Sequence, residues 1–475
     1  MVYQNLRTLS SIIDTKFKSD IRVENKHMKY DHLNSTTQLS RLVVAPNRRF
    51  LCLENGQPFF WLGDTAWWIW RLNPELREHY FLQRNRQGFT LVQVHCGFQG
   101  IDYAGNRPYV NDQPHQPNEA YWQTIDEIVA QAGAHQLYVA LVPMWGQEYG
   151  QAFGLDAQAA ETFGHWIGSR YQDQSHVLWI VSGEYDAING FRLPISAEQK
   201  RLFNAVARGL HSAHQGRQLM TIHPGVARAS SLDFHAESWL DFNMLQSGHM
   251  NDCSQYNLPE NYELIEADYA RLPVKPVLDG EPFYEDTPDG VWSEKTIHRP
   301  RADAAAMRRK AYGAVFSGAF GHTYGHNDVY GFFEPAYHGR VIDLPEGPGQ
   351  RGDWRSALLA EGAQQMNHLR RLIESRSFFD RVPDDHLLLG DPGKGISRIK
   401  ATRSAGGTWG MVYVPFGQPV QVDFSRLAGK EFRASWFDPR TGSIQVIGQV
   451  QAEDRFVFTP PAAGEDWVLV IDSSG

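Results

Sequence analysis

The sequence predicts an α/β protein in which a (β/α)8 TIM barrel is followed by a C-terminal antiparallel β-sandwich. First, eight short apolar runs alternate with longer stretches of helical periodicity, the pattern of repeated strand–helix units around a parallel sheet. Second, the C-terminal part contains only short β-rich runs separated by turn residues, which is typical of a sandwich. Third, 475 residues accommodate both domains, because a barrel of about 250–350 residues leaves about 90–100 for a sandwich.

The expected strands of the barrel are apolar almost throughout, as strands buried on both faces of a sheet should be. The stretches between them carry apolar residues at helical spacing. We expect strands at 59–63, 90–95, 138–143, 177–182, 219–223, 242–246, 276–280 and 314–318, and helices at 74–87, 120–134, 157–172, 197–214 and 301–312.

A long amphipathic helix is expected at 354–374, with one apolar face that packs on the barrel. Beyond it, turn signals such as Asp438-Pro439-Arg440-Thr441-Gly442 separate short strands. The expected sandwich strands are 396–401, 408–415, 420–424, 432–437, 444–448, 455–459 and 467–471. We therefore expect a catalytic barrel at 41–378, a sandwich at 379–475 and a poorly structured N-terminal extension at 1–40.

Charge and composition narrow the function. A formal net charge of −9 argues against nucleic acid as a partner, because nucleic-acid binding needs a basic surface. The 14 Trp and 19 Tyr suit a sugar-binding cleft, although a large aromatic core would explain them equally well.

The sequence contains no run of about 18 apolar residues, so no membrane span is expected. The N-terminal residues lack the apolar stretch of an export signal, so a cytoplasmic location is expected. The oligomeric state stays open.

No cofactor and no metal are expected. The three cysteines are widely spaced and form no CxxC pair. His322 and His326 have the spacing of a zinc pair, but no Glu lies between them and Gly325 disfavours a helix there.

Polar and aromatic side chains follow the strand runs, where a parallel barrel builds its active site. We expect Asp64, His95, His223, Gln246 and Tyr324 to hold hydroxyl groups of a carbohydrate substrate. Trp67 and Trp145 would form apolar walls, and His322 would be a further substrate contact. A single His at a strand end is as often a hydrogen-bonded packing residue, so each of these roles has a structural alternative.

Two carboxylates directly follow buried runs, namely Glu184 after 177–182 and Glu281 after 276–280. Glycoside cleavage needs one carboxylic acid to protonate the leaving oxygen and one carboxylate to attack the anomeric carbon or activate water. The ends of the fourth and seventh strands face each other across a barrel mouth, so the pair could flank one bond. Each Glu alone could instead cap a helix or pair with an Arg.

The same strand ends resemble a known family. The segment Asn55-Gly56-Gln57-Pro58-Phe59-Phe60-Trp61-Leu62-Gly63-Asp64-Thr65-Ala66-Trp67 resembles the start of the apiosidase-like glycoside hydrolases of family 140. The similarity continues through Ser182-Gly183-Glu184, Asp279-Gly280-Glu281-Pro282 and Gly321-His322-Thr323-Tyr324-Gly325, and covers the chain from about Arg41 onward. The last domain is similar to the small domain, labelled as collagen-binding, that accompanies these barrels.

The resemblance implies an acid/base at Glu184, a nucleophile at Glu281 and a substrate with a terminal furanosyl sugar such as apiose. We therefore expect a retaining, exo-acting glycosidase that acts on a plant-derived glycoside. Two features depart from the family: its acid/base is often Asp, and its members that attack cell-wall polymers are usually exported. Two alternatives stay open: action on another sugar, such as an arabinofuranoside or β-glucoside, or a non-catalytic carbohydrate-binding protein.

Overall fold

A computed structural model describes residues 38–97, 100–154, 156–189, 194–290, 298–334, 349–453 and 456–474. The expected N-terminal extension therefore lies almost entirely outside the described residues. A three-stranded antiparallel sheet of β1 (Leu42–Val44), β2 (Leu51–Leu53) and β3 (Pro58–Phe59) precedes the barrel. None of the helices in the described ranges is long and apolar enough to cross a membrane.

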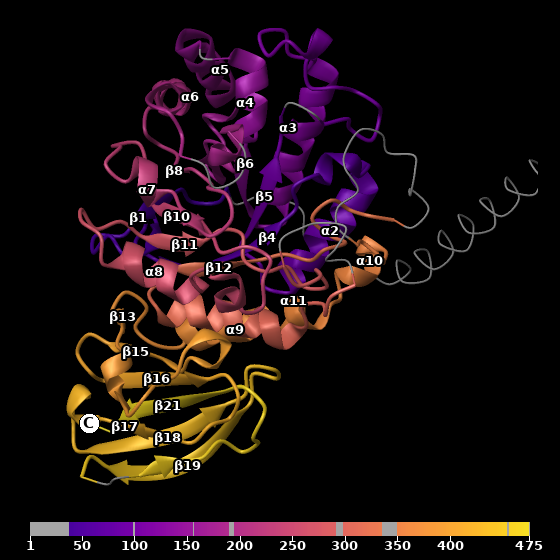
Figure 1. Ribbon diagram of the computed structural model, residues 1–475. Helices are drawn as coiled ribbons and strands as arrows, with labels where there is room; N and C mark the ends of the chain where they lie inside the picture. Colours follow the sequence, from indigo (N-terminus) through magenta and orange to yellow (C-terminus); the bar gives the residue numbers. More distant parts are fainter. Residues whose placement is uncertain are drawn as a thin grey trace, which may run out of the picture. The chain divides into compact units, whose positions relative to one another are not determined.

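Eight parallel strands form the barrel (Figure 1). Six of them hydrogen-bond in the order β12-β4-β5-β6-β7-β8, and β10 pairs with β11. The two remaining seams are bridged by the backbone, where Asp241 N–H donates to Met220 O at 2.9 Å and Phe320 N–H to Val277 O at 3.1 Å. The strands are β4 (Trp61–Thr65), β5 (Leu91–His95), β6 (Tyr138–Val142), β7 (Val177–Ile180), β8 (Met220–Thr221), β10 (Asn243–Gln246), β11 (Val277–Asp279) and β12 (Gly321–Tyr324).

Helices connect these strands, and several begin at residues that cap them. The Asn73 side chain accepts the Leu76 N–H at the start of α2, and Ser196 forms a capping box with Gln199 at the start of α6. The short strand β9 (Arg228–Ala229) runs antiparallel to β10. The helices are α2 (Pro74–Arg86), α3 (Glu119–Ala134), α4 (Gly146–Phe153), α5 (Ala157–Tyr171), α6 (Ala197–His214), α7 (Ser231–Phe234), α8 (Asn261–Tyr269), α9 (Ala304–Phe316), α10 (Trp354–Ala357) and α11 (Glu361–Glu374).

The eighth strand was predicted at the wrong place. Residues 314–316 are the last turn of α9, and the strand is β12, at Gly321–Tyr324. Helix α9 is buried on nearly all sides, so its end shows no polar face and cannot be distinguished by pattern from a buried strand. The true strand looked polar because it carries His322, Thr323 and Tyr324.

The helix expected at 354–374 is two helices, α10 and α11, so the prediction of one continuous helix was wrong. Ala360 has an extended ψ of 147° and separates them. The carbonyl oxygen of Leu358 accepts hydrogen bonds from Gln87 at 2.7 Å and Arg84 at 3.2 Å. Buried side chains of α2 therefore satisfy a carbonyl group that a continuous helix would have used.

The C-terminal domain has two antiparallel sheets, with strand orders β13-β15-β16-β21-β18-β19 and β14-β17-β20 (Figure 1). Of the predicted run at 455–459, residue 455 lies outside the described residues. The strands are β13 (Arg381–Pro383), β14 (Leu388–Leu389), β15 (Lys400–Ser404), β16 (Trp409–Val414), β17 (Val420–Val422), β18 (Glu431–Phe437), β19 (Ile444–Gln451), β20 (Val457–Phe458) and β21 (Trp467–Ser473).

Helix α9 joins the sandwich to the barrel. Arg308 forms a buried ion pair with Asp466, in which Nη2 lies 2.7 Å from Oδ1. One turn further along α9, the Tyr312 ring stacks on Tyr413 with centroids 4.7 Å apart and ring planes 16° apart. Trp409 and Val470 belong to the same apolar core as the barrel strands. The sandwich face that contains β16 and β21 is therefore part of the core that supports the barrel.

Candidate active site

Glu281 lies just beyond the C-terminal end of β11, and its carboxylate is bracketed by two imidazoles. Nε2 of His223 is 3.1 Å from Oε2, and Nε2 of His249 is 3.3 Å from Oε1. Burial and the neighbouring charge of Glu281 raise the pKa of the Tyr284 hydroxyl group, which therefore also lies close to this carboxylate. Burial alone would raise the pKa of Glu281, but the hydrogen bonds and positive charge of the two histidines outweigh it and lower the pKa to about 2. Glu281 is therefore an ionised carboxylate at neutral pH.

Glu184 lies beyond the end of β7, close enough to Glu281 that the two carboxyl groups influence each other. Burial, followed by the negative charge of Glu281, raises the pKa of Glu184 to about 7. The charge of His223 and a hydrogen bond donated by Gln246 act in the opposite direction, but they are weaker. At neutral pH this carboxyl group can therefore hold a proton beside an ionised partner.

The histidine between the two carboxylates is itself perturbed. Burial would lower the pKa of His223, but the hydrogen bond and charge of Glu281, together with Glu184, outweigh it and raise the pKa above the ordinary value. Backbone N–H groups fix the same region, since Tyr185 N–H donates to the His223 carbonyl oxygen at 3.1 Å. His223 therefore links the ends of β7, β8 and β11.

Aromatic rings surround the carboxylates. The Trp145 ring stacks on His95 with centroids 5.1 Å apart and planes 13° apart, and on His223 at 6.2 Å and 28°. Trp67 meets Trp145 edge-on at 5.2 Å, and its Nε1–H donates to the Tyr284 hydroxyl oxygen at 3.0 Å. Flat apolar faces beside hydrogen-bonding groups are what a sugar ring requires.

The structure brings together seven of the ten residues predicted from strand ends. Glu184, Glu281, Trp67, His95, Trp145, His223 and Gln246 are connected by the contacts above. The other three, Asp64, His322 and Tyr324, lie elsewhere.

Asp64 and Tyr324 lie on the outer face of the strands, against the helices. Asp64 Oδ2 accepts hydrogen bonds from Arg84 and from the Tyr80 hydroxyl group, each at 2.6 Å, and the residue has no exposed surface. The Tyr324 hydroxyl group donates to Glu285 at 2.6 Å. Because side chains alternate along a strand, the neighbours Gly63 and Thr65 face the inside of the barrel instead.

His322 shares the outer face with Asp64 and Tyr324, since it pairs in register with Leu62 on β4. It is 1% exposed, and burial lowers its pKa to about 3, so the ring is neutral. Its neighbour Thr323 faces inward, where the Thr323 hydroxyl oxygen accepts the Trp61 Nε1–H at 3.0 Å.

Three residues near the carboxylates were not predicted. His249 and Tyr284 each lie three residues beyond Gln246 and Glu281, respectively, in loops on the same rim. Glu148 lies in the first turn of α4 and holds His95, with Oε2 3.0 Å from Nε2. The usable signal was their place shortly after strands, in the loops that follow β10 and β11 and at the start of the helix that follows β6, because barrel sites are built from these connections as well as from strand ends.

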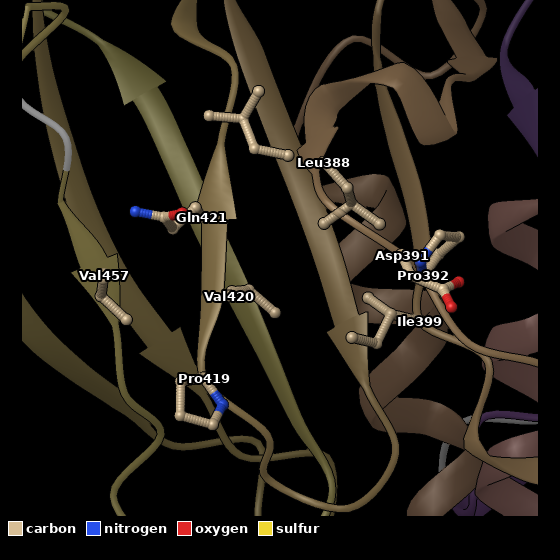
Figure 2. A pocket seen from close by; sticks show the side chains of 9 residues that line it. Leu388, Asp391, Pro392, Ile399, Pro419, Val420, Gln421 and Val457 are labelled. Atoms are coloured by element: carbon tan, nitrogen blue, oxygen red, sulfur yellow. The ribbon is translucent and has the colours of Figure 1, made fainter.

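A groove of about 250 Å³ lies on the sandwich, away from these residues (Figure 2). It is lined by Leu388, Leu389, Asp391, Pro392, Ile399, Pro419, Val420, Gln421 and Val457. Asp391 is the one carboxylate among these lining residues, so this groove cannot supply the two carboxyl groups that glycoside cleavage needs.

Comparison with known proteins identifies the chain. Residues 45–380 match the model of the apiosidase-like catalytic domain. The chain belongs to this family. Residues 382–472 match a second model, described as "Putative collagen-binding domain of a collagenase". A search of curated proteins found no match.

Solved structures of glycoside hydrolases are similar to this chain over most of its length. One glycoside hydrolase structure is 31% identical with a TM-score of 0.81, and the match covers 92% of this chain and 97% of the other. A glycoside hydrolase of family 5 from Bacteroides vulgatus is also 31% identical with a TM-score of 0.81, covering 91% of this chain and 94% of the other. The apiosidase-like protein is a glycoside hydrolase, and the barrel is its catalytic domain.

Proposed function

We propose that this glycoside hydrolase is a retaining, exo-acting enzyme of family 140 that releases a terminal furanosyl sugar, such as apiose, from a plant-derived glycoside. The catalytic part is supported by the position of Glu281, with Nε2 of His223 3.1 Å and Nε2 of His249 3.3 Å from its carboxylate, beside Glu184. These surroundings raise the pKa of Glu184 and lower that of Glu281. Such a pair divides into a proton donor and a charged nucleophile at neutral pH. The match to the apiosidase-like model supports the furanosyl sugar.

In the first step, an oxygen of Glu281 attacks the anomeric carbon while Glu184 transfers its proton to the leaving oxygen. The glycosidic bond breaks, the alcohol leaves, and the sugar stays attached to Glu281 as an ester. In the second step, the now ionised Glu184 takes a proton from water, and the resulting oxygen attacks the same carbon. The ester bond breaks, so both carboxyl groups return to their starting states.

The surrounding residues prepare both groups for these roles. His223 and His249 keep Glu281 charged, and Gln246 orients the Glu184 carboxyl group by its hydrogen bond. Trp67 and Trp145 supply apolar faces for the sugar ring. The sugar and its linkage would then be selected by hydroxyl contacts within this ring of side chains.

The test is hydrolysis of an apiosyl aryl glycoside beside a panel that includes arabinofuranosides and β-glucosides. Release of one sugar, with kcat lowered about a thousandfold in both Glu184→Ala and Glu281→Ala, supports the proposal. A thousandfold loss corresponds to about 4 kcal/mol of activation barrier. Azide should restore activity to each variant with opposite stereochemistry of the glycosyl azide, because it replaces the nucleophile in one and the activated water in the other. Cleavage of a different sugar in the panel would refute the apiose assignment.

A further inference from the structure

The backbone of Glu184 is held in an unusual conformation. Its φ of +37° lies in the left-handed region, which residues with a side chain seldom adopt. Such a conformation persists only where the surrounding structure determines it, and it is often found where a functional side chain must be aimed.

The segment at the start of α4 holds the residue before Glu184. Gly183 N–H donates to Met144 O at 3.1 Å, and Gly146 N–H donates to Gly183 O at 2.8 Å. Trp145 and Gly183 form an isolated parallel bridge between these two bonds. A Cβ atom at Gly183 would lie 1.3 Å from Cε3 of Trp145, so the indole ring rests directly on the Gly183 backbone.

Trp145 is in turn held by one carboxylate oxygen. Oε2 of Glu148 accepts the Trp145 backbone N–H at 2.6 Å and lies 3.0 Å from Nε2 of His95, whose ring stacks on Trp145. Glu148 is 2% exposed and lies in the first turn of α4, where the helix dipole favours a negative charge. Oε2 of Glu148 thus contacts both the Trp145 backbone and His95, the ring on which Trp145 stacks.

We propose that Glu148 is a positioning residue for Glu184 and acts on it through Trp145 and Gly183. The inference rests on the proposed role of Glu184 as the acid. Without Glu148, the Trp145 ring and its backbone bridge lose their anchor, Gly183 is no longer held, and the Glu184 carboxyl group moves away from Glu281.

Such a movement can be measured by titrating Glu184. The charged and titratable groups that act on it are Glu281 and Asp186, which raise its pKa, and His223, which lowers it. Burial and Glu281 are the leading causes of the raised pKa, so displacement toward solvent or away from Glu281 lowers it toward the ordinary value.

The experiment compares Glu148→Ala with Glu148→Gln. The Gln amide oxygen can accept both N–H groups, so this variant keeps the anchor and removes only the charge. We expect Glu148→Ala to lower kcat about tenfold or more with a smaller change in KM, and to move the basic limb of the pH profile down by about half a unit or more. Glu148→Gln should lower kcat less and leave the basic limb of the pH profile at its wild-type position. Glu119→Gln, on α3 in an exposed pair with Arg170, is the matched control.

The pH titration of the Glu184 carboxyl band in the infrared, assigned with Glu184→Gln, needs no substrate. It separates this inference from the proposed function, because a downward shift in Glu148→Ala supports positioning even if no glycoside is cleaved. If Glu148→Ala does not fold, Glu148→Asp, one methylene shorter, should show a smaller shift in the same direction. A folded variant with an unmoved titration overturns the inference, even if activity falls, because that result would assign Glu148 to another role.

Discussion

The pKa of Glu184 predicts how pH controls the reaction. The first step requires this group to be protonated, and its pKa of about 7 leaves about nine-tenths of it protonated at pH 6 and about one-hundredth at pH 9. Raising the pH from 6 to 9 should therefore lower kcat/KM about 90-fold. Glu281, with a pKa of about 2, stays ionised over the whole interval and contributes no limb there.

The assay uses two aryl glycosides of one sugar that differ only in the leaving group. A phenol needs the proton from Glu184, whereas a dinitrophenol departs as its anion without one. We expect the full decline with the phenyl glycoside and an almost flat profile with the dinitrophenyl glycoside. Glu184→Ala should lose about three orders of magnitude on the phenyl substrate, far less on the other, and show no limb on either.

Two results would refute this reasoning. If both glycosides decline in parallel between pH 6 and 9, the limb belongs to a group other than the proton donor. If Glu184→Ala keeps the wild-type limb, Glu184 is not the titrating group, and His223, which is also perturbed and contacts Glu281, becomes the candidate.

Three further predictions concern stability. Folding raises the pKa of Glu184 from 4.5 to about 7, so the folded state binds the proton more tightly than the unfolded state. The free energy of unfolding should therefore fall by up to about 3 kcal/mol as the pH rises through this interval. In thermal unfolding, Glu184→Gln should be as stable as wild type near pH 4 and more stable than wild type at pH 8. Arg308→Met leaves the buried Asp466 carboxylate without its cation and should lower the free energy of unfolding by about 3–5 kcal/mol. The double variant Arg308→Met with Asp466→Leu should recover most of this loss in denaturant titrations. Asp64→Asn should destabilise the fold because Arg84 loses its buried counter-charge, yet leave KM unchanged in the glycoside assay; an altered KM with unchanged stability would contradict the position of Asp64 on the outer face.

The barrel and the sandwich could be predicted because their strands are bounded by clear turns and their apolar runs are short. Seven of the eight barrel strands overlap the predicted runs, and the eighth was displaced into α9. Helix α9 is buried between the barrel and the sandwich, so it has almost no solvent-facing side. Its sequence therefore lacks the alternation of apolar and polar faces by which a helix is recognised. The break between α10 and α11 likewise depends on Arg84 and Gln87, about 270 residues away in sequence.

The two carboxylates of the candidate site could be predicted from the sequence, whereas two of the side chains that contact Glu281 could not. Glu184 and Glu281 each follow a glycine a few residues beyond a strand, so their place at the mouth followed from the barrel alone. His249 and Tyr284 reach the same carboxylate from loops whose course is set by tertiary contacts, including the packing of their rings at 4.5 Å. Local sequence carries no information about that course.

Asp64 shows what decides whether a carboxylate at a strand end faces the mouth or the helices. On a strand buried on both faces, hydrophobicity cannot indicate the direction of a side chain. A buried carboxylate on the outer face does need a partner, however, and α2 supplies Arg84 on its buried side.

Glu281 meets no such cation on the helix that follows it. On α9, the buried cations Arg308 and Lys310 pair with Asp466 and Glu260. The third cation, Arg309, is only partly buried and donates to the Asn251 amide oxygen at 3.1 Å. The cations of α6, which follows Glu184, are likewise paired with other carboxylates, as Lys200 is with Glu237. A strand-end carboxylate should therefore be assigned to the mouth only when the next helix offers no unpaired cation on its buried side. By this rule, Glu184 and Glu281 belong at the mouth and Asp64 does not.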